Sequence, residues 1–119
     1  MKTIMLVDDS TSIRNILKNA LIGQYAVVEA EHGKDALSKL GAQTVDLFLF
    51  DVNMPEMDGI ELLAEVRKKP SYAKTPILML TTETKEELRQ KGRELGASGW
   101  IVKPCEPDKL LSAIQKLIP

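Results

Sequence analysis

The sequence predicts one α/β domain built on a parallel sheet that helices cover on both faces. Five short apolar runs alternate with five amphipathic segments along the 119 residues. Several runs are continuously apolar, as in residues 47–50 and 77–80, which is typical of strands buried on both faces. Because parallel neighbours need a crossover connection, strands that alternate with helices indicate a parallel sheet.

The strands are expected at the apolar runs, with a helix after each. The predicted strand ranges are 3–7, 26–30, 45–50, 76–80 and 100–102. The first helix ends at Gly23, and its apolar face consists of Ile13, Ile16, Leu17, Ala20 and Leu21. The last helix repeats this pattern with Leu110, Leu111, Ile114, Leu117 and Ile118.

Thinner apolar faces predict the three middle helices. These faces consist of Ala36, Leu37 and Leu40, then Ile60, Leu63 and Val66, then Leu88, Gly92 and Leu95. Residues 70–76 form the longest irregular stretch and are expected to be an ordinary connection. Because no linker or repeat interrupts the pattern, residues 1–119 are predicted to form one domain.

Composition argues against several classes of protein. Sixteen basic and seventeen acidic residues give a formal net charge of −1, too balanced for binding nucleic acid or an anionic membrane by bulk electrostatics. The apolar run before Asp8 is too short for a signal peptide, and no stretch has the length of a membrane span. A single cysteine cannot form an internal disulfide. The expected location is the cytoplasm.

Charged and polar side chains follow four of the predicted strands, at the edge where sheets of this kind bind ligands. They are Asp8 and Asp9 after the first strand, Asp51 after the third, Thr81 after the fourth and Lys103 after the fifth. Each has an ordinary explanation when taken alone; Asp9 or Ser10, for example, could cap the following helix. Their joint occurrence at four strand ends favours a functional site.

The three carboxylates predict a site for a hard divalent cation. Crowded carboxylates raise one another's pKa unless a cation neutralises them. Mg²⁺ prefers oxygen ligands, so we expect Asp8, Asp9 and Asp51 to bind Mg²⁺ or Mn²⁺. His32 stands alone and Cys105 has no partner thiol, which argues against zinc or copper. We expect His32 to be a plain surface residue and Cys105 a small apolar one.

The same side chains suit phosphoryl transfer. A carboxylate can act as a nucleophile and form an aspartyl phosphate. Such transfer depends mainly on positioning and on neutralising the charge of the phosphoryl oxygens. A metal ion could hold one of these oxygens, Lys103 a second and Thr81 a third.

Four segments resemble the receiver domains of response regulators in two-component signalling. They are Val-Asp-Asp at 7–9, Asp51 in Asp-Val-Asn-Met-Pro-Glu-Met-Asp-Gly, Thr81 after an apolar strand, and Gly-Ala-Ser-Gly-Trp-Ile-Val-Lys-Pro at 96–104. The resemblance covers the whole chain and is greatest to the single-domain chemotaxis regulators. It implies a flavodoxin-like three-layer α/β/α sandwich with the parallel strand order 2-1-3-4-5.

The resemblance also implies a role for each site residue. Asp51 would be the phosphoacceptor, and the main-chain carbonyl of Asn53 would join the three carboxylates as a metal ligand. Thr81 and Lys103 would bind the phosphoryl group, and the peptide bond from Lys103 to Pro104 could be cis. Thr81 and Trp100 would form the switch pair. Asn53 and Glu83 would tune dephosphorylation.

Three positions depart from the usual pattern of the family. Trp100 stands where tyrosine or phenylalanine is usual, and Cys105 stands where phenylalanine is common. Val52 stands where the best-known chemotaxis protein has tryptophan. None of the three touches the phosphorylation chemistry, but Trp100 bears on the motion that follows it.

The predicted function is that of a signalling switch rather than of a conventional enzyme. A sensor histidine kinase or phosphotransfer protein would donate the phosphoryl group, and the domain would catalyse its own phosphorylation and dephosphorylation. The phosphorylated form would bind an effector, such as the flagellar motor switch, and a separate phosphatase could act on it. In the family, the charged helix at 85–94, the fifth strand and the last helix form the partner surface.

Two alternatives remain at this point. The chain could be a receiver excised from a longer regulator or hybrid kinase. It could also be an aspartate-nucleophile phosphatase, although that family would need a second aspartate where Asn53 stands.

Overall fold

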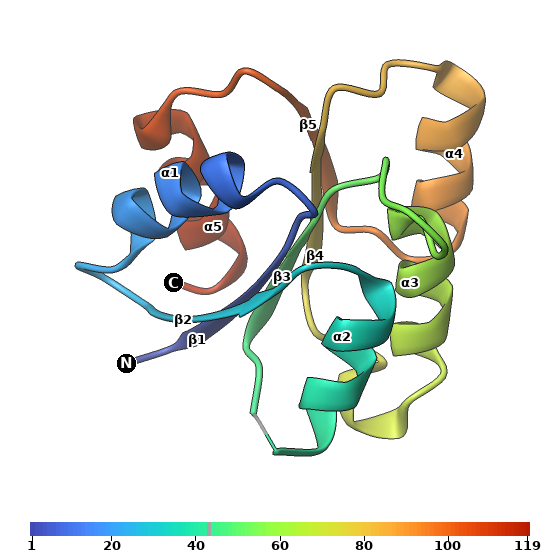
Figure 1. Cartoon of the computed structure of the whole chain (residues 1–119), viewed down its shortest axis with the longest axis horizontal. Helices are drawn as coiled ribbons and strands as arrows, with labels where there is room; N and C mark the ends of the chain where they lie inside the picture. The colour runs from blue at the N-terminus through green and yellow to red at the C-terminus, as the bar shows by residue number, and fades with distance from the viewer. Residues whose placement is uncertain (43) are drawn as a thin grey trace.

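A five-stranded parallel sheet lies between two layers of helices in the part of the chain that the computed structural model describes, residues 1–42 and 44–119 (Figure 1). The strands are β1 (Thr3–Val7), β2 (Ala26–Ala30), β3 (Leu47–Phe50), β4 (Ile77–Thr81) and β5 (Gly99–Val102). Their order across the sheet is β2-β1-β3-β4-β5, and every neighbouring pair is parallel. The predicted α/β/α sandwich and its strand order are confirmed.

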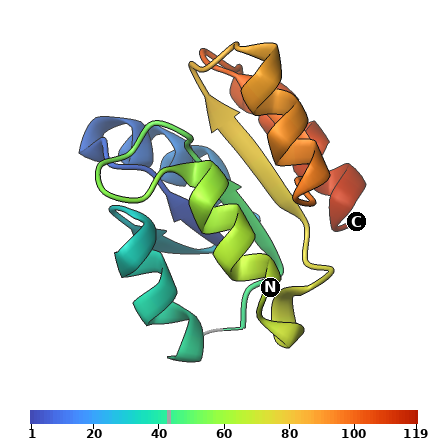
Figure 2. The same ribbon diagram turned by 90° about the vertical axis from the view of Figure 1, so that its right-hand side faces the viewer.

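Helices cover both faces of this sheet. They are α1 (Thr11–Leu21), α2 (Gly33–Lys39), α3 (Gly59–Arg67), α4 (Glu86–Glu94) and α5 (Pro107–Leu117), with short 3-10 turns at Leu40–Ala42 and Pro70–Tyr72. Figures 1 and 2 show α1 and α5 on one face and α2, α3 and α4 on the other. Among the described residues, no helix combines the length and apolar composition that crossing a membrane requires.

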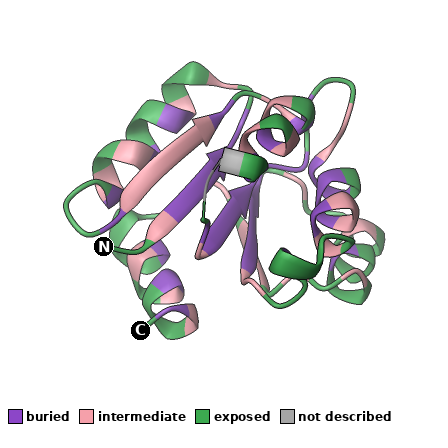
Figure 3. Ribbon diagram, turned by 90° about the horizontal axis from the view of Figure 1, so that it is seen from below, coloured by how far each residue is buried: buried purple, intermediate pink, exposed green. Residues whose placement is uncertain are grey.

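The core forms two layers because side chains alternate along each strand. Ile4 and Leu6 of β1 pack toward α1 and α5, whereas Met5 and Val7 pack into the cluster beneath α2 and α3. All four residues of β3 are buried, and Figure 3 shows the central strands buried between the helical layers. Burial on both faces explains why these strands read as continuous apolar runs.

Some predicted boundaries and faces are wrong. The third strand begins at Leu47 rather than 45, because Asp46 lies in a bend where its carboxylate accepts a hydrogen bond from the N–H of Thr3 at 2.7 Å. The fourth strand lies one residue later than predicted, consistent with proline lacking a ladder donor at position 76. Residues 70–76 contain a helical turn in which Tyr72 is buried. Ile16, predicted on the buried face of α1, is 61% exposed.

Local hydrogen bonds fix where the helices begin. The Ser10 hydroxyl accepts from the N–H of Ile13 at 3.3 Å, so Ser10 and not Asp9 caps α1. At α2 the Nδ1 atom of His32 accepts from the N–H of Asp35 at 3.1 Å. The expectation that His32 is a plain surface residue was therefore wrong, because it caps a helix.

Candidate functional site

The carboxyl ends of β1 and β3 and the loop after β5 bring four charged side chains together. The ammonium group of Lys103 donates to Asp8 Oδ2 at 2.7 Å and to Asp51 Oδ2 at 3.3 Å. The Lys103 side chain is 14% exposed, and Asp8 and Asp51 are 2% and 9% exposed as residues. The predicted convergence of these strand ends is present, and one lysine joins two of the carboxylates.

Asp9 completes the acidic cluster. One carboxylate oxygen from each of Asp8, Asp9 and Asp51 lies within 4.8 Å of the others, and Asp9 is exposed to solvent. Three carboxylates face a single ammonium group here, so the cluster has a net negative charge that a bound cation would neutralise. An all-oxygen donor set with an open, solvent-facing side fits Mg²⁺, which keeps several waters. The residues present therefore fit the metal that the family implies.

Hydrogen bonds hold both the main chain and the carboxylate of Asp51. Its N–H donates to Val7 O at 3.0 Å, and its Oδ1 atom accepts from the N–H of exposed Asn53 at 3.4 Å. Gly59, the first residue of α3, packs directly against this backbone: a Cβ atom there would lie 2.1 Å from the carbonyl oxygen of Asp51. Only glycine allows α3 to begin this close to Asp51.

Thr81 and Trp100 are linked through the main chain of Glu83. Thr81 is fully buried at the end of β4, and its hydroxyl oxygen accepts from the N–H of Glu83 at 3.1 Å. The carbonyl of Glu83 accepts from the indole N–H of Trp100 at 3.1 Å. The indole lies over Gly92, where a Cβ atom would come within 3.2 Å of the ring. Sequence reasoning paired Thr81 with Trp100 but did not identify this connection.

The loop after β5 carries Lys103 into the site. The peptide bond between Lys103 and Pro104 is cis, as expected, and the N–H of Lys103 donates to Thr81 O at 2.8 Å. Cys105 packs against the core layer beneath α1 and α5, as a small apolar residue would. Together with Ile13 and Ile16 it lines a mostly apolar hollow of about 370 Å³ beside Lys103.

Arg14 is a residue that sequence reasoning missed. It is 8% exposed, and its guanidinium donates to the main-chain carbonyl of Asp8. The sequence feature that could have identified it is its spacing, because Arg14 lies on the same stripe of α1 as Leu17 and Leu21, the other buried residues of this helix.

The chain belongs to the response regulator receiver domain family, whose sequence profile matches residues 4–115. Receiver domains are signalling phosphoacceptors that bind Mg²⁺ at an acidic pocket and interact with sensor kinases and downstream effectors. The chain is thus a receiver domain of a two-component response regulator, and the phosphatase alternative is not favoured.

Its relatives include chemotaxis proteins of the same size. The structure of CheY4 of Vibrio cholerae is 44% identical, with a TM-score of 0.94 over 99% of each chain. Chemotaxis protein CheY1 of Helicobacter pylori is 36% identical over 118 residues, which are 97% of this chain and 95% of that protein. ResD of Bacillus subtilis, a transcriptional regulatory protein, is 39% identical, but the chain spans only 47% of its length. These likenesses support a chemotaxis-type receiver.

Proposed function

We propose that this receiver domain, residues 1–119, takes a phosphoryl group onto Asp51 from a phosphohistidine of a sensor kinase or phosphotransfer protein. The observation that carries the proposal is the position of Lys103. Its ammonium group contacts Asp51 at 3.3 Å and lies beside a cluster of carboxylates that fits Mg²⁺. A nucleophile, a fixed cation and a metal site at one sheet edge are the requirements of phosphoryl transfer.

The transfer moves one group between two side chains. A carboxylate oxygen of Asp51 attacks the phosphorus atom of the phosphohistidine while the bond between phosphorus and the imidazole nitrogen breaks. That nitrogen keeps the electron pair and takes up a proton, and Asp51 becomes an acyl phosphate. Lys103 neutralises charge on the transferred oxygens, and the Thr81 hydroxyl donates to one of them.

The metal would be held by side chains at the ends of β1 and β3. Asp8, Asp9 and Asp51 supply carboxylate oxygens, and the main-chain carbonyl of Asn53 supplies a fourth protein ligand. Bound Mg²⁺, or Mn²⁺ in its place, neutralises negative charge on the phosphoryl oxygens. The ammonium group of Lys103, which contacts Asp8 and Asp51, moves toward the phosphoryl group when the phosphoryl group arrives.

The same domain removes its phosphoryl group. Water attacks the phosphorus atom, the bond from phosphorus to the Asp51 oxygen breaks, and inorganic phosphate leaves. Asn53 and Glu83 flank the site and tune this rate. We expect a lifetime of seconds to minutes, measured by decay of labelled protein after removal of the donor. Persistence for many hours would show that these two residues do not set the rate.

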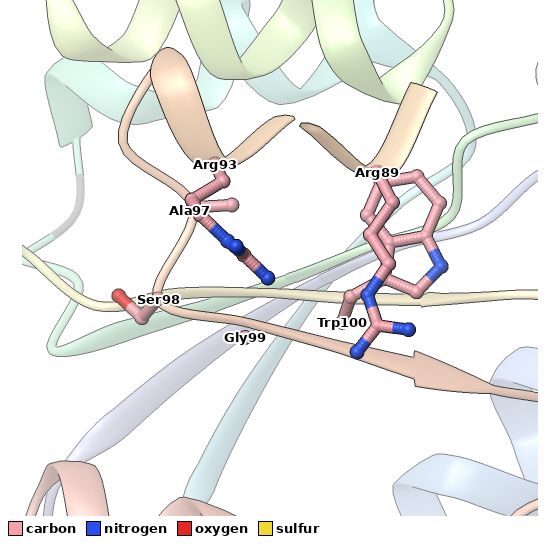
Figure 4. A pocket seen from close by; sticks show the side chains of 6 residues that line it. All are labelled: Arg89, Arg93, Ala97, Ser98, Gly99 and Trp100. Atoms are coloured by element: carbon pink, nitrogen blue, oxygen red, sulfur yellow. The ribbon is translucent and has the colours of Figure 1, made fainter. Parts of the chain in front are cut away.

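The output surface lies on α4, β5 and α5. Figure 4 shows Arg89 and Arg93 of α4 around a hollow of about 210 Å³ that the indole of Trp100 also lines. Two arginines one helical turn apart favour a protein effector that brings carboxylates to this hollow. Because CheY4 and CheY1 are chemotaxis proteins of the same size, the flagellar motor switch is the proposed effector. The proposed location is the cytoplasm, with no direct nucleic-acid or membrane partner.

Labelling with a small phosphodonor tests the acceptor. Acetyl phosphate with Mg²⁺ should add one phosphoryl group, and EDTA or Asp51→Asn should abolish the addition. Asp46→Asn is a matched control, since Asp46 precedes the opposite end of β3. Full labelling of the Asp51→Asn protein by mass spectrometry would refute the assignment. Steady turnover of phosphomonoesters by wild type would favour a phosphatase.

A further inference from the structure

Arg14 is a nearly buried cation that the proposed phosphorylation chemistry does not use. Its side chain is 9% exposed, projects from α1, and contacts Glu29 of β2 and the main chain of Asp8. Burying a guanidinium is costly unless its N–H groups are paired. Its contacts should therefore show what it does.

The guanidinium joins three segments of the chain. One terminal nitrogen donates to the carbonyl of Asp8, at the end of β1, and the other donates to the hydroxyl of Thr11 at 3.3 Å. The Nε atom lies 3.5 Å from the carboxylate of Glu29 on β2, and Lys18 lies 3.3 Å from that same carboxylate. The planar guanidinium group of Arg14, with its two terminal nitrogens, thus spans the turn from β1 to α1.

We propose that Arg14 is a positioning residue that holds the main chain of Asp8 so that the carboxylates of Asp8 and Asp9 keep the spacing a divalent cation needs. The proposal rests on the metal role proposed above for the acidic cluster. Asp8 has little freedom of its own, because its two carboxylate oxygens accept from the Ser10 N–H at 2.9 Å and from Lys103 at 2.7 Å. A shift of the Asp8 main chain would therefore move the carboxylates of Asp8 and Asp9 together.

Charge alone does not account for a buried arginine here. A positive charge near the site opposes the binding of a second cation, which would make Arg14 unfavourable for Mg²⁺. Glu29 offsets only part of this charge, because Lys18 shares the same carboxylate. Any benefit of Arg14 to metal binding must therefore come from the position of its hydrogen bonds and not from its charge. Lysine carries the same charge but cannot donate to two acceptors in one plane. Replacing Arg14 by lysine therefore separates the effect of geometry from that of charge.

The test is direct binding of Mn²⁺, followed by electron paramagnetic resonance of the free ion. Arg14→Lys should raise the Kd for Mn²⁺ about fivefold or more. Arg67→Lys is the matched control, because Arg67 donates to the carbonyls of Tyr72, Thr75 and Gly96 at 2.6–2.8 Å, away from the acidic cluster. It should lower the melting temperature and leave the Kd unchanged.

Glu29→Gln provides a second and milder variant. It keeps the arginine and leaves an amide oxygen as acceptor, but it removes the charge of the carboxylate that orients the Nε atom, so the Kd should rise about twofold to threefold. Exposed charges are screened in about 0.5 M salt. If the position of Arg14 causes the rise in the Kd for Mn²⁺, the rise should therefore persist at this salt concentration.

Three outcomes would overturn the proposal. If both variants bind Mn²⁺ like wild type while their melting temperatures fall, Arg14 only attaches α1 to β2. If the effect of Glu29→Gln disappears in high salt and Arg14→Lys has no effect, charge and not position is responsible. If wild type itself binds no Mn²⁺, the proposed metal site fails along with the role of Arg14. This result is distinct from equal binding by wild type and Arg14→Lys, which removes the positioning role alone.

Discussion

Removing the charge of Asp9 should stabilise the metal-free protein and weaken its stabilisation by Mg²⁺. Carboxylate oxygens of Asp8, Asp9 and Asp51 lie within 4.8 Å of one another. At this separation two unit charges repel by about 0.9 kcal/mol in a water-like medium and by about 3.5 kcal/mol at an effective dielectric constant near 20. Because Asp9 is exposed, the lower figure applies to it.

Lys103 reduces the net repulsion further. Its ammonium group contacts Asp8 and Asp51 and offsets about one of their two charges, which leaves Asp9 repelled by roughly one remaining carboxylate. We therefore expect Asp9→Asn to stabilise the metal-free protein by about 1 kcal/mol, or about 4 °C in melting temperature for a domain of this size. Wild type should gain about 1.4 kcal/mol from Mg²⁺ at tenfold over its Kd. Asp9→Asn should gain clearly less.

Thermal unfolding with and without Mg²⁺, at constant ionic strength, measures both effects. Glu65→Gln is the matched control: it removes one exposed carboxylate on α3, whose partner Lys68 is also exposed, and should change neither quantity by much. An Asp9→Asn protein less stable than wild type without Mg²⁺ would refute the reasoning. Loss of a helix cap could not explain that result, because Ser10 caps α1.

Two further predictions concern Trp100 and Asp35. Phosphorylation should lower acrylamide quenching of Trp100 and shift its emission to the blue, and Thr81→Ala should abolish the change without blocking labelling; unchanged emission at full labelling would contradict this. The N–H of Glu31 donates to the Asp35 carboxylate and lowers the pKa of Asp35 below its ordinary value. The stabilisation of the fold by ionised Asp35 is thus present above the unfolded pKa and lost as pH falls through the folded pKa. Asp35→Asn should therefore lower the free energy of unfolding by a few tenths of a kcal/mol at neutral pH. Measured by urea unfolding, this difference should shrink below about pH 4.

The strands and the convergence of the charged residues could be predicted from the sequence. Continuous apolar runs identify strands buried on both faces, and parallel strands must place their carboxyl ends at one edge. Asp8, Asp51 and Lys103 were predicted on that basis, and the structure brings their side chains into contact.

Features that depend on distant parts of the chain could not be predicted in this way. The helical pattern of α1 favoured a buried Ile16, and although the spacing of Arg14 with Leu17 and Leu21 was visible, its partners were not, because Asp8 follows β1 and Glu29 lies on β2. The hydrogen bond between Trp100 and the carbonyl of Glu83 likewise depends on where the loop after β4 lies, which local sequence does not specify.

The contact between Gly59 and Asp51 limits which side of the site can move. Any side chain at position 59 would overlap the Asp51 carbonyl, and the N–H of Gly59 also donates to the carbonyl of Val52 at 2.9 Å. We therefore expect Asp51 and the start of α3 to move together. On the proposed phosphorylation of Asp51, we expect the conformational change to arise at the end of β4 instead, where the Thr81 hydroxyl accepts from the N–H of Glu83 in the following loop. The site is in this sense asymmetric: we expect the contact between Asp51 and α3 to stay fixed and the contacts of Thr81 to change.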